Sequence, residues 1–499
     1  VAGGPRATSQ GLPEVVAPVG NPVTAARVRL GTALFWDEQL SFSGTVACGS
    51  CHLPEAGGSD PRAWIDPESV THPGPDGVPG TRDDWVGSVG VPTEIGGTPQ
   101  ITARRPRTMI GAAFAATAFW DGRAGDSFVD PDSGEVLLTE GAALETQALK
   151  PLLSEVEMNR AGRLHGEIMD GLARAVPLAL SPAVPSELRD WIGTRGYPAL
   201  FEEAFGDPQV TAARTAMAIA SYQRTLIPSK APVLDPDAWL SPLEREGQRV
   251  FEAKKCADCH DPTHGLFLDG EFHFIGQADP AVDPGRAAIT GAEADAGKFL
   301  TPTLLNVALR APYFHDGSKE SLDEVLDFYT RGGDHGDPAA REIEPARFTG
   351  PERKALLAFL GRPLTDARVA RAIGPFERPL LRSEAHGARI TAAVRGISAP
   401  SMGFLRETPT MVRAHAARPF AAFLPAESIA ILLGSPYLAI GRVPTSDLLE
   451  LSFAVPKVVP TVGIFRGQSV LADVAPLFPD RRMRGTVSVV IETSTDSGD

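Results

Sequence analysis

Two short motifs of the form Cys-x-x-Cys-His constrain this chain more than any other feature of its sequence. They comprise Cys48, Cys51 and His52 in the first copy and Cys256, Cys259 and His260 in the second, and they use all 4 cysteines of the 499 residues. Two thiols at this spacing can each form a thioether bond to one porphyrin, and the adjacent histidine then faces the iron as its proximal ligand. The sequence therefore predicts two covalently bound haem c groups.

Zinc knuckles and structural disulfides use the same residue types as these motifs. A structural zinc site takes four protein ligands, and no second cysteine pair or paired histidines follow either motif at the spacing of a zinc finger. A redox-active Cys-x-x-Cys is not expected to carry a trailing histidine twice. The duplicated motif favours haem over both alternatives.

Size and charge exclude several classes of protein. A chain of 499 residues exceeds one ordinary hydrophobic core, so two to four domains are expected. Hydrophobic residues make up 43% of a mixed-charge sequence, which indicates a globular protein, and no apolar run reaches the roughly 18 residues of a membrane span. The formal net charge of -15 argues against nucleic-acid binding and favours encounter with a basic patch on a partner.

The cofactor also bears on location. Attachment of haem c implies an exported protein, so the bacterial periplasm is the expected compartment. The chain starts at Val1 and lacks a basic region followed by an apolar one, so we expect a signal peptide that is not present in this chain.

The segments that accompany the two motifs resemble each other beyond the cysteines. Residues 108–122 align without gaps on residues 303–317, and they end in Phe-Trp-Asp-Gly and Phe-His-Asp-Gly respectively. A helix is predicted before each motif, over about 24–36 in the first copy and from a capping box at Ser241 in the second. Similarity of this kind is typical of a duplicated structural unit.

The predicted fold is mainly α-helical, with two tandem cytochrome c-like haem domains followed by a β-rich accessory domain. Its predicted parts are an N-terminal segment 1–21, a first haem domain 22–228, a second haem domain 229–370 and the accessory domain 371–499. After about Ala370 there is no Cys or Trp, and short β-prone runs are bounded by Gly and Pro, at 388–394, 428–433, 448–455 and 486–493. These runs favour a small sandwich.

Two loops in the first haem domain have local signatures of their own. The Asp-Ser-Gly within 129–136 predicts a short hairpin. Residues 76–84 carry carboxylates that can wrap a calcium ion, but their spacing is not that of an EF-hand. An ordinary turn-rich loop is therefore the favoured interpretation.

Each haem also needs residues on the side opposite its histidine. For the second haem, Ser321 begins a helix that Gly332 ends, and Tyr329 shares the apolar face of that helix with Leu322 and Leu326. A phenolate is a known ligand of haem iron, so Tyr329 is a candidate second ligand. A buried tyrosine that hydrogen-bonds a carbonyl is the alternative.

For the first haem, Gln147 and Glu157 lie on the segment that follows the Phe-Trp-Asp-Gly motif. A carboxylate above an open iron can take the proton from bound peroxide and return it to the departing oxygen. Taken alone, Glu157 is one of 62 acidic residues, most of which are expected to be solvated. Trp120 can pass an oxidising equivalent between the haems, although a lone tryptophan is more often a core residue.

Taken together, these motifs resemble the bacterial di-haem cytochrome c peroxidase superfamily, which also holds MauG-like enzymes that oxidise tryptophan on a partner protein. The resemblance runs from about Pro22 to Ala370, and its motifs lie at 30–37, 48–52, 119–124, 147–149, 156–159, 256–260 and 311–317. It implies a peroxidatic haem ligated by His52 and an electron-relay haem ligated by His260. It also implies that Trp120 lies between the haems, with Gln147 and Glu157 in the distal peroxide pocket.

Two positions depart from the ordinary members of that superfamily. Where they ligate the relay haem with methionine, the matching residue is Tyr329, which is the residue type of MauG-like enzymes. A hard anionic phenolate stabilises ferric iron and lowers its potential. Where they carry an asparagine that helps to bind calcium between the domains, this chain has Arg105, so a bound calcium stays open.

The resemblance also makes His72 a candidate for the movable distal histidine that closes the peroxidatic haem in many peroxidases. It lies in an inserted loop rich in Pro and Gly, so an exposed loop histidine is the alternative.

These inferences predict a periplasmic di-haem peroxidase-type oxidoreductase. The first hypothesis is reduction of hydrogen peroxide to water with electrons from a small donor protein, either a cytochrome c or a cupredoxin. The second is MauG-like oxidation of a tryptophan side chain on a protein substrate. The third is an electron-transfer protein without catalysis, which the pairing of Gln147 with Glu157 disfavours.

Overall fold

The computed structural model describes residues 11–61, 71–72, 85–86, 102–160 and 162–382, and beyond these the strands of the C-terminal region. The chain divides into two compact units, one made of residues 1–79 and 83–382 and the other of residues 80–82 and 383–499. Within the described residues, no helix has both the length and the apolar character that crossing a bilayer requires.

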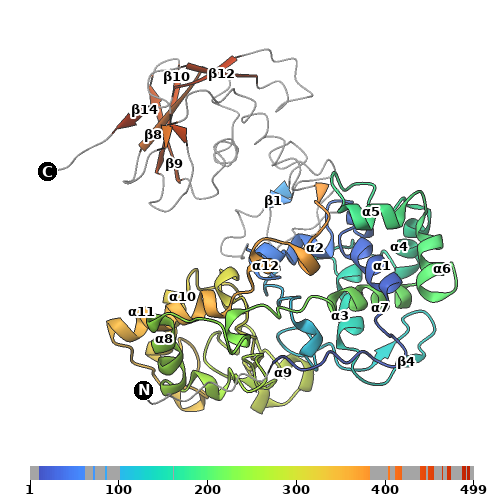
Figure 1. Ribbon diagram of the computed structural model, residues 1–499, viewed down its shortest axis with the longest axis horizontal. Coiled ribbons are helices and arrows are strands. Elements are labelled where there is room, and N and C mark those ends of the chain that lie inside the picture. The colour runs from blue at the N-terminus through green and yellow to red at the C-terminus, as the bar shows by residue number, and fades with distance from the viewer. Residues whose placement is uncertain are drawn as a thin grey trace. The chain divides into compact units, whose positions relative to one another are not determined.

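The first unit is rich in helices, as predicted (Figure 1). Its α-helices are α1 Ala25–Phe35, α2 Cys48–Cys51, α3 Ala143–Leu153, α4 His165–Arg174, α5 Ser186–Ile192, α6 Tyr197–Phe205, α7 Ala212–Gln223, α8 Pro242–Ala253, α9 Ala287–Thr290, α10 Leu322–Arg331, α11 Gly350–Leu360 and α12 Ala367–Ala370. Its single-turn 3₁₀ helices are η1 Glu38–Leu40, η2 Pro54–Ala56, η3 Ala112–Phe114, η4 Pro232–Leu234, η5 Cys256–Asp258, η6 Glu293–Asp295, η7 Val307–Leu309, η8 Pro338–Ala340, η9 Arg362–Leu364 and η10 Gly374–Phe376. Short strands connect them at β1 Thr71–His72, β2 Trp85–Val86, β3 Phe128–Val129, β4 Val136–Leu138, β5 Phe272–His273 and β6 Phe299–Leu300.

Each haem motif is preceded by a helix that crosses a later helix at a glycine. Helix α1 packs on α7, and α8 packs on α11. A methyl group at Gly31 would overlap the carbonyl of Ala218, and one at Gly247 would overlap the carbonyl of Ala355. Only glycine, which has no Cβ, allows the two backbones to approach this closely. The same close crossing therefore supports both haem motifs.

Two hydrophobic cores lie on either side of the predicted boundary after residue 228. The first draws on residues 30–226, and the second on residues 231–364. The first core also includes Phe376 and Leu381, so the helical unit continues to Arg382 instead of ending near residue 370. The division into two haem domains stays a prediction, which the two separate cores support.

The internal repeat predicted from the sequence is visible in the backbone. Positive φ angles fall at aligned positions, namely Gly111, Phe119 and Gly122 in one copy and Asn306, Phe314 and Gly317 in the other. The 3₁₀ turns η3 and η7 also occupy aligned positions. A positive φ is unfavourable for a bulky residue such as phenylalanine. Its recurrence at both phenylalanines means that the two segments fold alike.

The two copies meet through a reciprocal pair of backbone hydrogen bonds. The N–H of Arg105 donates to the carbonyl of His315 at 2.6 Å, and the N–H of Leu300 donates to the carbonyl of Trp120 at 2.9 Å. In the ungapped alignment Arg105 corresponds to Leu300, and Trp120 corresponds to His315. Each bond is therefore the repeat-related equivalent of the other, as it would be across a two-fold axis.

Local predictions in this unit can be compared with the structure. The hairpin expected at 129–136 is confirmed, because β3 pairs antiparallel with β4. Ser241 caps α8 in the reciprocal box that was predicted. Ser321 caps α10 as expected, and the Glu324 carboxylate accepts from the N–H of Glu320 and not from that of Ser321.

The C-terminal unit is described only at its strands. These are β7 Gly403–Phe404, β8 Met411–Ala417, β9 Ala439–Thr445, β10 Leu448–Ala454, β11 Gly463–Ile464, β12 Ser469–Asp473, β13 Thr486–Val490 and β14 Glu492–Ser494. Four of them form an antiparallel sheet in the order β14-β8-β10-β9. Strands β10, β13 and β14 fall on predicted runs, whereas the runs at 388–394 and 428–433 lie outside the described residues. The sandwich domain stays a prediction.

Candidate active site

The first haem motif lines a cavity of about 620 Å³. This volume lies within the range of about 300–1,000 Å³ that is usual for ligand and cofactor sites. The walls include Cys48, Cys51 and His52 of the motif together with Trp120, Gln147 and Glu157. These six residues therefore gather around one cavity, although they are far apart along the chain.

Local structure presents the first motif to this cavity. Helix α2 is a single turn that begins at Cys48 and ends at Cys51, and His52 is its C-cap residue. The Ser50 hydroxyl accepts a hydrogen bond from the N–H of Ala47 at 3.0 Å. A Cβ at Gly49 would overlap the ring of Trp36, so the turn rests directly on that buried side chain.

The two motif histidines are held in the same way. Nδ1 of His52 lies 3.2 Å from the carbonyl oxygen of Gly58, and Nδ1 of His260 lies 3.1 Å from that of Phe267. Because a carbonyl can only accept, Nδ1 must donate, and Nε2 is the nitrogen left to coordinate iron. Burial lowers the pKa of His52 and that of His260, the latter to about 4, which keeps the ligating imidazole neutral. The donor sets therefore fit haem at both motifs.

Gln147 and Glu157 reach the cavity from α3 and from the turn that follows it. Gln147 lies on α3, and the N–H of Glu157 donates to the Ser154 carbonyl at 3.1 Å in that turn. Burial raises the pKa of Glu157, and the Arg123 charge partly opposes the shift. A carboxyl group whose pKa is raised toward neutrality suits proton exchange with a substrate.

Trp120 lies where the two repeats meet. Its indole N–H donates to the Arg105 carbonyl at 2.8 Å, and its ring meets that of His315 edge to face, with the ring centroids 6.4 Å apart. His315 in turn stacks on Phe299 with the centroids 4.0 Å apart. Trp120 thus lines the first cavity and also contacts the second repeat, unlike an ordinary core tryptophan.

Tyr329 lies on α10 beside the second motif. Burial raises the pKa of its phenol, and the nearby sulfurs of Cys256 and Cys259 add to the shift. In the part of the chain that the structure describes, its hydroxyl has no hydrogen-bond partner, so the alternative of a tyrosine bonded to a carbonyl is not what the structure contains. Its ligation of the second haem stays a prediction.

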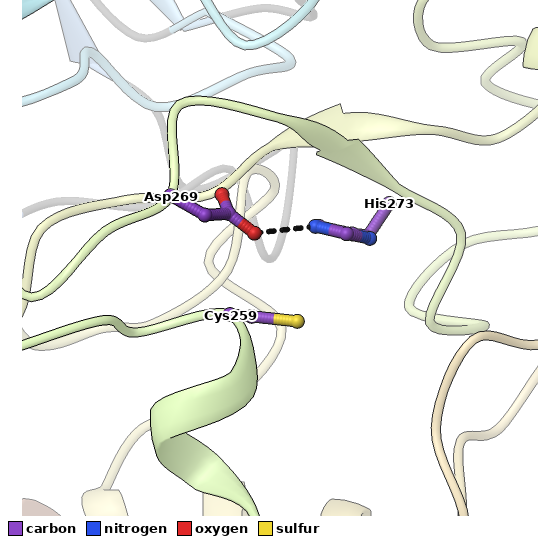
Figure 2. Close-up of side chains that lie close together, drawn as sticks. All are labelled: Cys259, Asp269 and His273. Atoms are coloured by element: carbon purple, nitrogen blue, oxygen red, sulfur yellow. Dashed lines mark hydrogen bonds and ion pairs between the residues drawn. The ribbon is translucent and has the colours of Figure 1, made fainter.

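A cluster of metal-type ligands surrounds the second motif as well. Figure 2 shows Cys259, Asp269 and His273, whose ligand atoms all lie within 4.8 Å of one another. His273 contacts Asp269 at 2.7 Å and Glu342 at 2.6 Å. The Cys259 sulfur, with Glu342 and Asp269, raises the pKa of His273 to about 10. Because Cys259 belongs to the haem motif, a thioether would remove it as an ion ligand, and we assign the cluster to the surroundings of the second haem.

The structure leaves two of the predicted sites open. His72 belongs to β1, which pairs with β2, but its side chain lies outside what the structure describes, so its ligation of haem stays a prediction. Residues 76–84, the candidate calcium loop, lie outside the described residues, and calcium there also stays a prediction.

Sequence reasoning missed several residues of the cavity wall. Arg107, Arg123 and Gln223 line it together with the predicted residues. Arg123 could have been predicted from the sequence, because it follows directly on the Phe-Trp-Asp-Gly motif. Its guanidinium forms an ion pair with Asp121 at 3.0 Å. Gln223 ends α7 and has no comparable signal, since only the tertiary packing of α7 on α1 brings it to the cavity.

Comparison with known proteins agrees with this geometry. Residues 25–241 match the family model described as "Di-haem cytochrome c peroxidase". The methylamine utilization protein MauG of Methylorubrum extorquens is 32% identical over 350 residues, which cover 69% of this chain and 79% of that protein. The cytochrome c551 peroxidase of Pseudomonas aeruginosa is 27% identical over 328 residues, covering 63% of this chain and 75% of that one.

Solved structures give the same picture. A MauG-like protein associated with microbial copper homeostasis is 28% identical with a TM-score of 0.52, covering 74% of this chain and 98% of that one. The diheme peroxidase BthA from Burkholderia thailandensis shares the fold at 20% identity and a TM-score of 0.50, covering 72% of this chain and 91% of that one. The chain belongs to the di-haem cytochrome c peroxidase family. It is a peroxidase-type oxidoreductase, and its family implies haem c as the cofactor.

Proposed function

We propose that this enzyme reduces hydrogen peroxide to water in the periplasm, with electrons from a small donor protein such as a cytochrome c or a cupredoxin. The observation that supports this most directly is the single cavity shared by His52, Gln147 and Glu157. Two electrons and two protons convert one peroxide molecule into two waters. A haem held by Cys48, Cys51 and His52 would supply the iron chemistry that cleaves the oxygen–oxygen bond.

The side chains of the cavity serve the proton transfers. Glu157 takes a proton from one oxygen of the peroxide and delivers it to the other oxygen, which departs as water when the oxygen–oxygen bond is cleaved. The raised pKa of Glu157 suits this exchange, because the group must accept and release a proton within one turnover. The Gln147 amide, which can both donate and accept, orients the peroxide.

Electrons are proposed to reach the first haem through Trp120. It lines the cavity and contacts His315 of the second repeat, so it offers an aromatic group between the two haem segments. A second haem held by Cys256, Cys259, His260 and Tyr329 would relay electrons from the donor.

A second candidate function is MauG-like oxidation of a tryptophan on a protein substrate. The place of Tyr329 on α10 favours it, because a tyrosine that ligates haem iron does so as a phenolate, which stabilises the ferric state and opposes simple relay from a reduced donor. In that reaction peroxide supplies the oxidising equivalents and the protein substrate supplies the electrons, which again reduce peroxide to water.

Addition of peroxide to two forms of the holoprotein separates the candidates. If the half-reduced form alone turns over with reduced cytochrome c, peroxide reduction holds. If the diferric form gives a long-lived oxidised state shared by both haems and shows little cytochrome c activity, protein oxidation holds. If neither form reacts with peroxide, both candidates are wrong.

Replacement of Tyr329 by methionine tests the ligand assignment. We expect the spectrum of the second haem to change and its reduction potential to rise, because a neutral thioether replaces an anionic oxygen. Tyr313→Phe, which alters another tyrosine near the second motif, is the control and is expected to keep the wild-type spectrum. A Tyr329→Met variant with an unchanged second haem would remove Tyr329 from the ligand set.

A further inference from the structure

Three arginines lie where the two repeats meet. Arg105 and Arg310 are buried, with 6% and 8% of their surface exposed, and Arg107 faces the first cavity. Within the described residues, none of the three forms an ion pair with a carboxylate. Their neighbour Arg104 behaves differently, because it pairs with Asp121 and Asp283.

These three guanidinium groups donate their hydrogen bonds to neutral oxygens. The guanidinium of Arg105 donates to the carbonyls of Asp60, Arg310 and Pro312 and to the hydroxyl of Ser59. That of Arg107 donates to the carbonyls of Phe119 and Thr301, both at 3.3 Å, and that of Arg310 donates to the carbonyl of Thr303. The Nε of Arg105 is buried and has no partner among the described residues.

The cluster is electrostatically incomplete. Burial lowers the pKa of each of the three guanidinium groups to about 10. The charges of Asp60 and Asp316 oppose the shift at Arg105, and the Arg105 and Arg107 charges add to the shift at Arg310. All three still carry a full charge at neutral pH. Buried charges in proteins are normally paired, because an uncompensated one costs several kcal/mol. Three mutually repelling cations therefore indicate a site built for anions.

We propose that Arg105, Arg107 and Arg310 bind the propionate carboxylates of the two haems. Each haem carries two propionates, and a planar guanidinium can bind a carboxylate through two parallel hydrogen bonds. Arg107 lines the first cavity and so serves the first haem. Arg310 serves the second haem, because it donates to the carbonyl of Thr303, whose hydroxyl donates in turn to the carbonyl of Leu266 in the loop after the second motif. Arg105 bonds to both repeats and serves both haems.

This inference rests on the two haem sites of the proposed function and not on peroxide turnover. Arg105 stands where ordinary members of the family carry a calcium-binding asparagine. The arginine cluster therefore supplies positive charge at that position. A chelator of calcium is accordingly expected to leave both haem spectra unchanged.

The test uses the holoprotein and measures the reduction potential of each haem by spectroelectrochemistry, after haem content has been determined. Arg107→Leu should lower the potential of the first haem, since removing a nearby positive charge favours the ferric form. A tenfold change in the ferric-to-ferrous ratio corresponds to about 59 mV for this one-electron couple, and we expect at least that. Arg310→Leu should do the same at the second haem.

Resonance Raman spectra supply a second readout, because the propionate bending band reports hydrogen bonding to the carboxylates. The band should shift in Arg107→Leu. Arg107→Lys keeps the positive charge, so the reduction potential of its first haem should stay close to the wild-type value. If the leucine variant fails to retain haem, the lysine variant is the one to measure. Arg195→Leu is the control, since Arg195 also donates to backbone carbonyls but lies outside the cavity wall.

Three outcomes would overturn the inference. The first is an Arg107→Leu holoprotein whose first-haem potential and propionate band match the wild type. The second is an Arg107→Lys variant whose first-haem reduction potential falls as far as that of Arg107→Leu. The third is a potential that responds to added inorganic phosphate as strongly as to the substitution, which would assign the site to a free anion. Failure of the unsubstituted holoprotein to turn over peroxide would count against the proposed function and would leave the potentials and the propionate band as a separate test of this inference.

Discussion

The two haem segments share one backbone plan and differ in the side chains placed on it. Both have a helix crossing at a glycine and a motif histidine whose Nδ1 is tied to a carbonyl. At aligned positions, however, one copy has Trp120 and the other His315. The first motif lines the cavity with Glu157, whereas the second lies beside Tyr329. The shared backbone is suited to haem attachment in both copies. The few residues that differ between the copies are expected to give each haem a different role.

The largest expected effect tests the chemistry assigned to the first segment. Glu157→Gln keeps the shape of the side chain but cannot exchange a proton, so peroxide turnover should fall by about 10²–10⁴. Steady-state kinetics with a reduced donor measure this loss. The control is Glu155→Gln, an exposed neighbour in the same turn, which should turn over at the wild-type rate. A Glu157→Gln variant that stays within a few-fold of wild type would contradict the assignment.

The next effect compares two ion pairs that differ in burial. Arg224 and Glu145 meet at 2.7 Å in the first segment with 2% and 0% of their side chains exposed, whereas Arg362 and Glu244 in the second are 49% and 9% exposed. Arg224→Leu leaves a buried carboxylate unpaired and should cost about 3–5 kcal/mol of stability. Arg362→Leu should cost about 1 kcal/mol or less. Denaturant unfolding of the holoproteins measures both, and equal losses would contradict the comparison.

A smaller effect tests the helix crossings that the segments share. Gly31→Ala and Gly247→Ala should each lower stability by about 1–3 kcal/mol, because the methyl group meets a backbone carbonyl that cannot move aside. Gly171→Ala on α4, where the added Cβ meets nothing, is the matched control and should raise stability slightly. If only one of the two crossings proves sensitive, the shared plan is weaker than the structure indicates.

The smallest effect concerns acid. The Arg362 guanidinium lowers the pKa of Glu244 to about 2. A carboxyl group whose folded pKa is depressed stabilises the fold above its unfolded pKa of roughly 4.3, and this contribution is lost as the pH falls toward 2. The stability difference between wild type and Arg362→Leu should therefore be present at neutral pH and vanish in strong acid. A difference that persists in strong acid would mean that packing, not charge, accounts for it.

Much of this architecture could be predicted from local sequence. Capping residues such as Thr24 and Ser241 mark helix starts, and the ungapped repeat identified segments whose backbones match at Phe119 and Phe314. The gathering of Gln147 and Glu157 around the first motif came from the family resemblance, since neither residue has a local signal of its own.

Other features follow from tertiary packing alone. Nothing near Phe376 in the sequence shows that it returns to the first core, because that contact depends on where the chain re-enters the helical unit. The missing counter-charges of Arg105 and Arg107 likewise appear only when burial and partners are known.

The reciprocal bonds from Arg105 to His315 and from Leu300 to Trp120 also bear on how such a chain arises. A self-complementary contact of this kind is what two identical single-haem proteins would make as a homodimer. Fusion of the two genes would keep that contact inside one polypeptide and free each half to mutate without its twin. A tryptophan on one side of the axis and a histidine on the other is an asymmetry that no homodimer could encode.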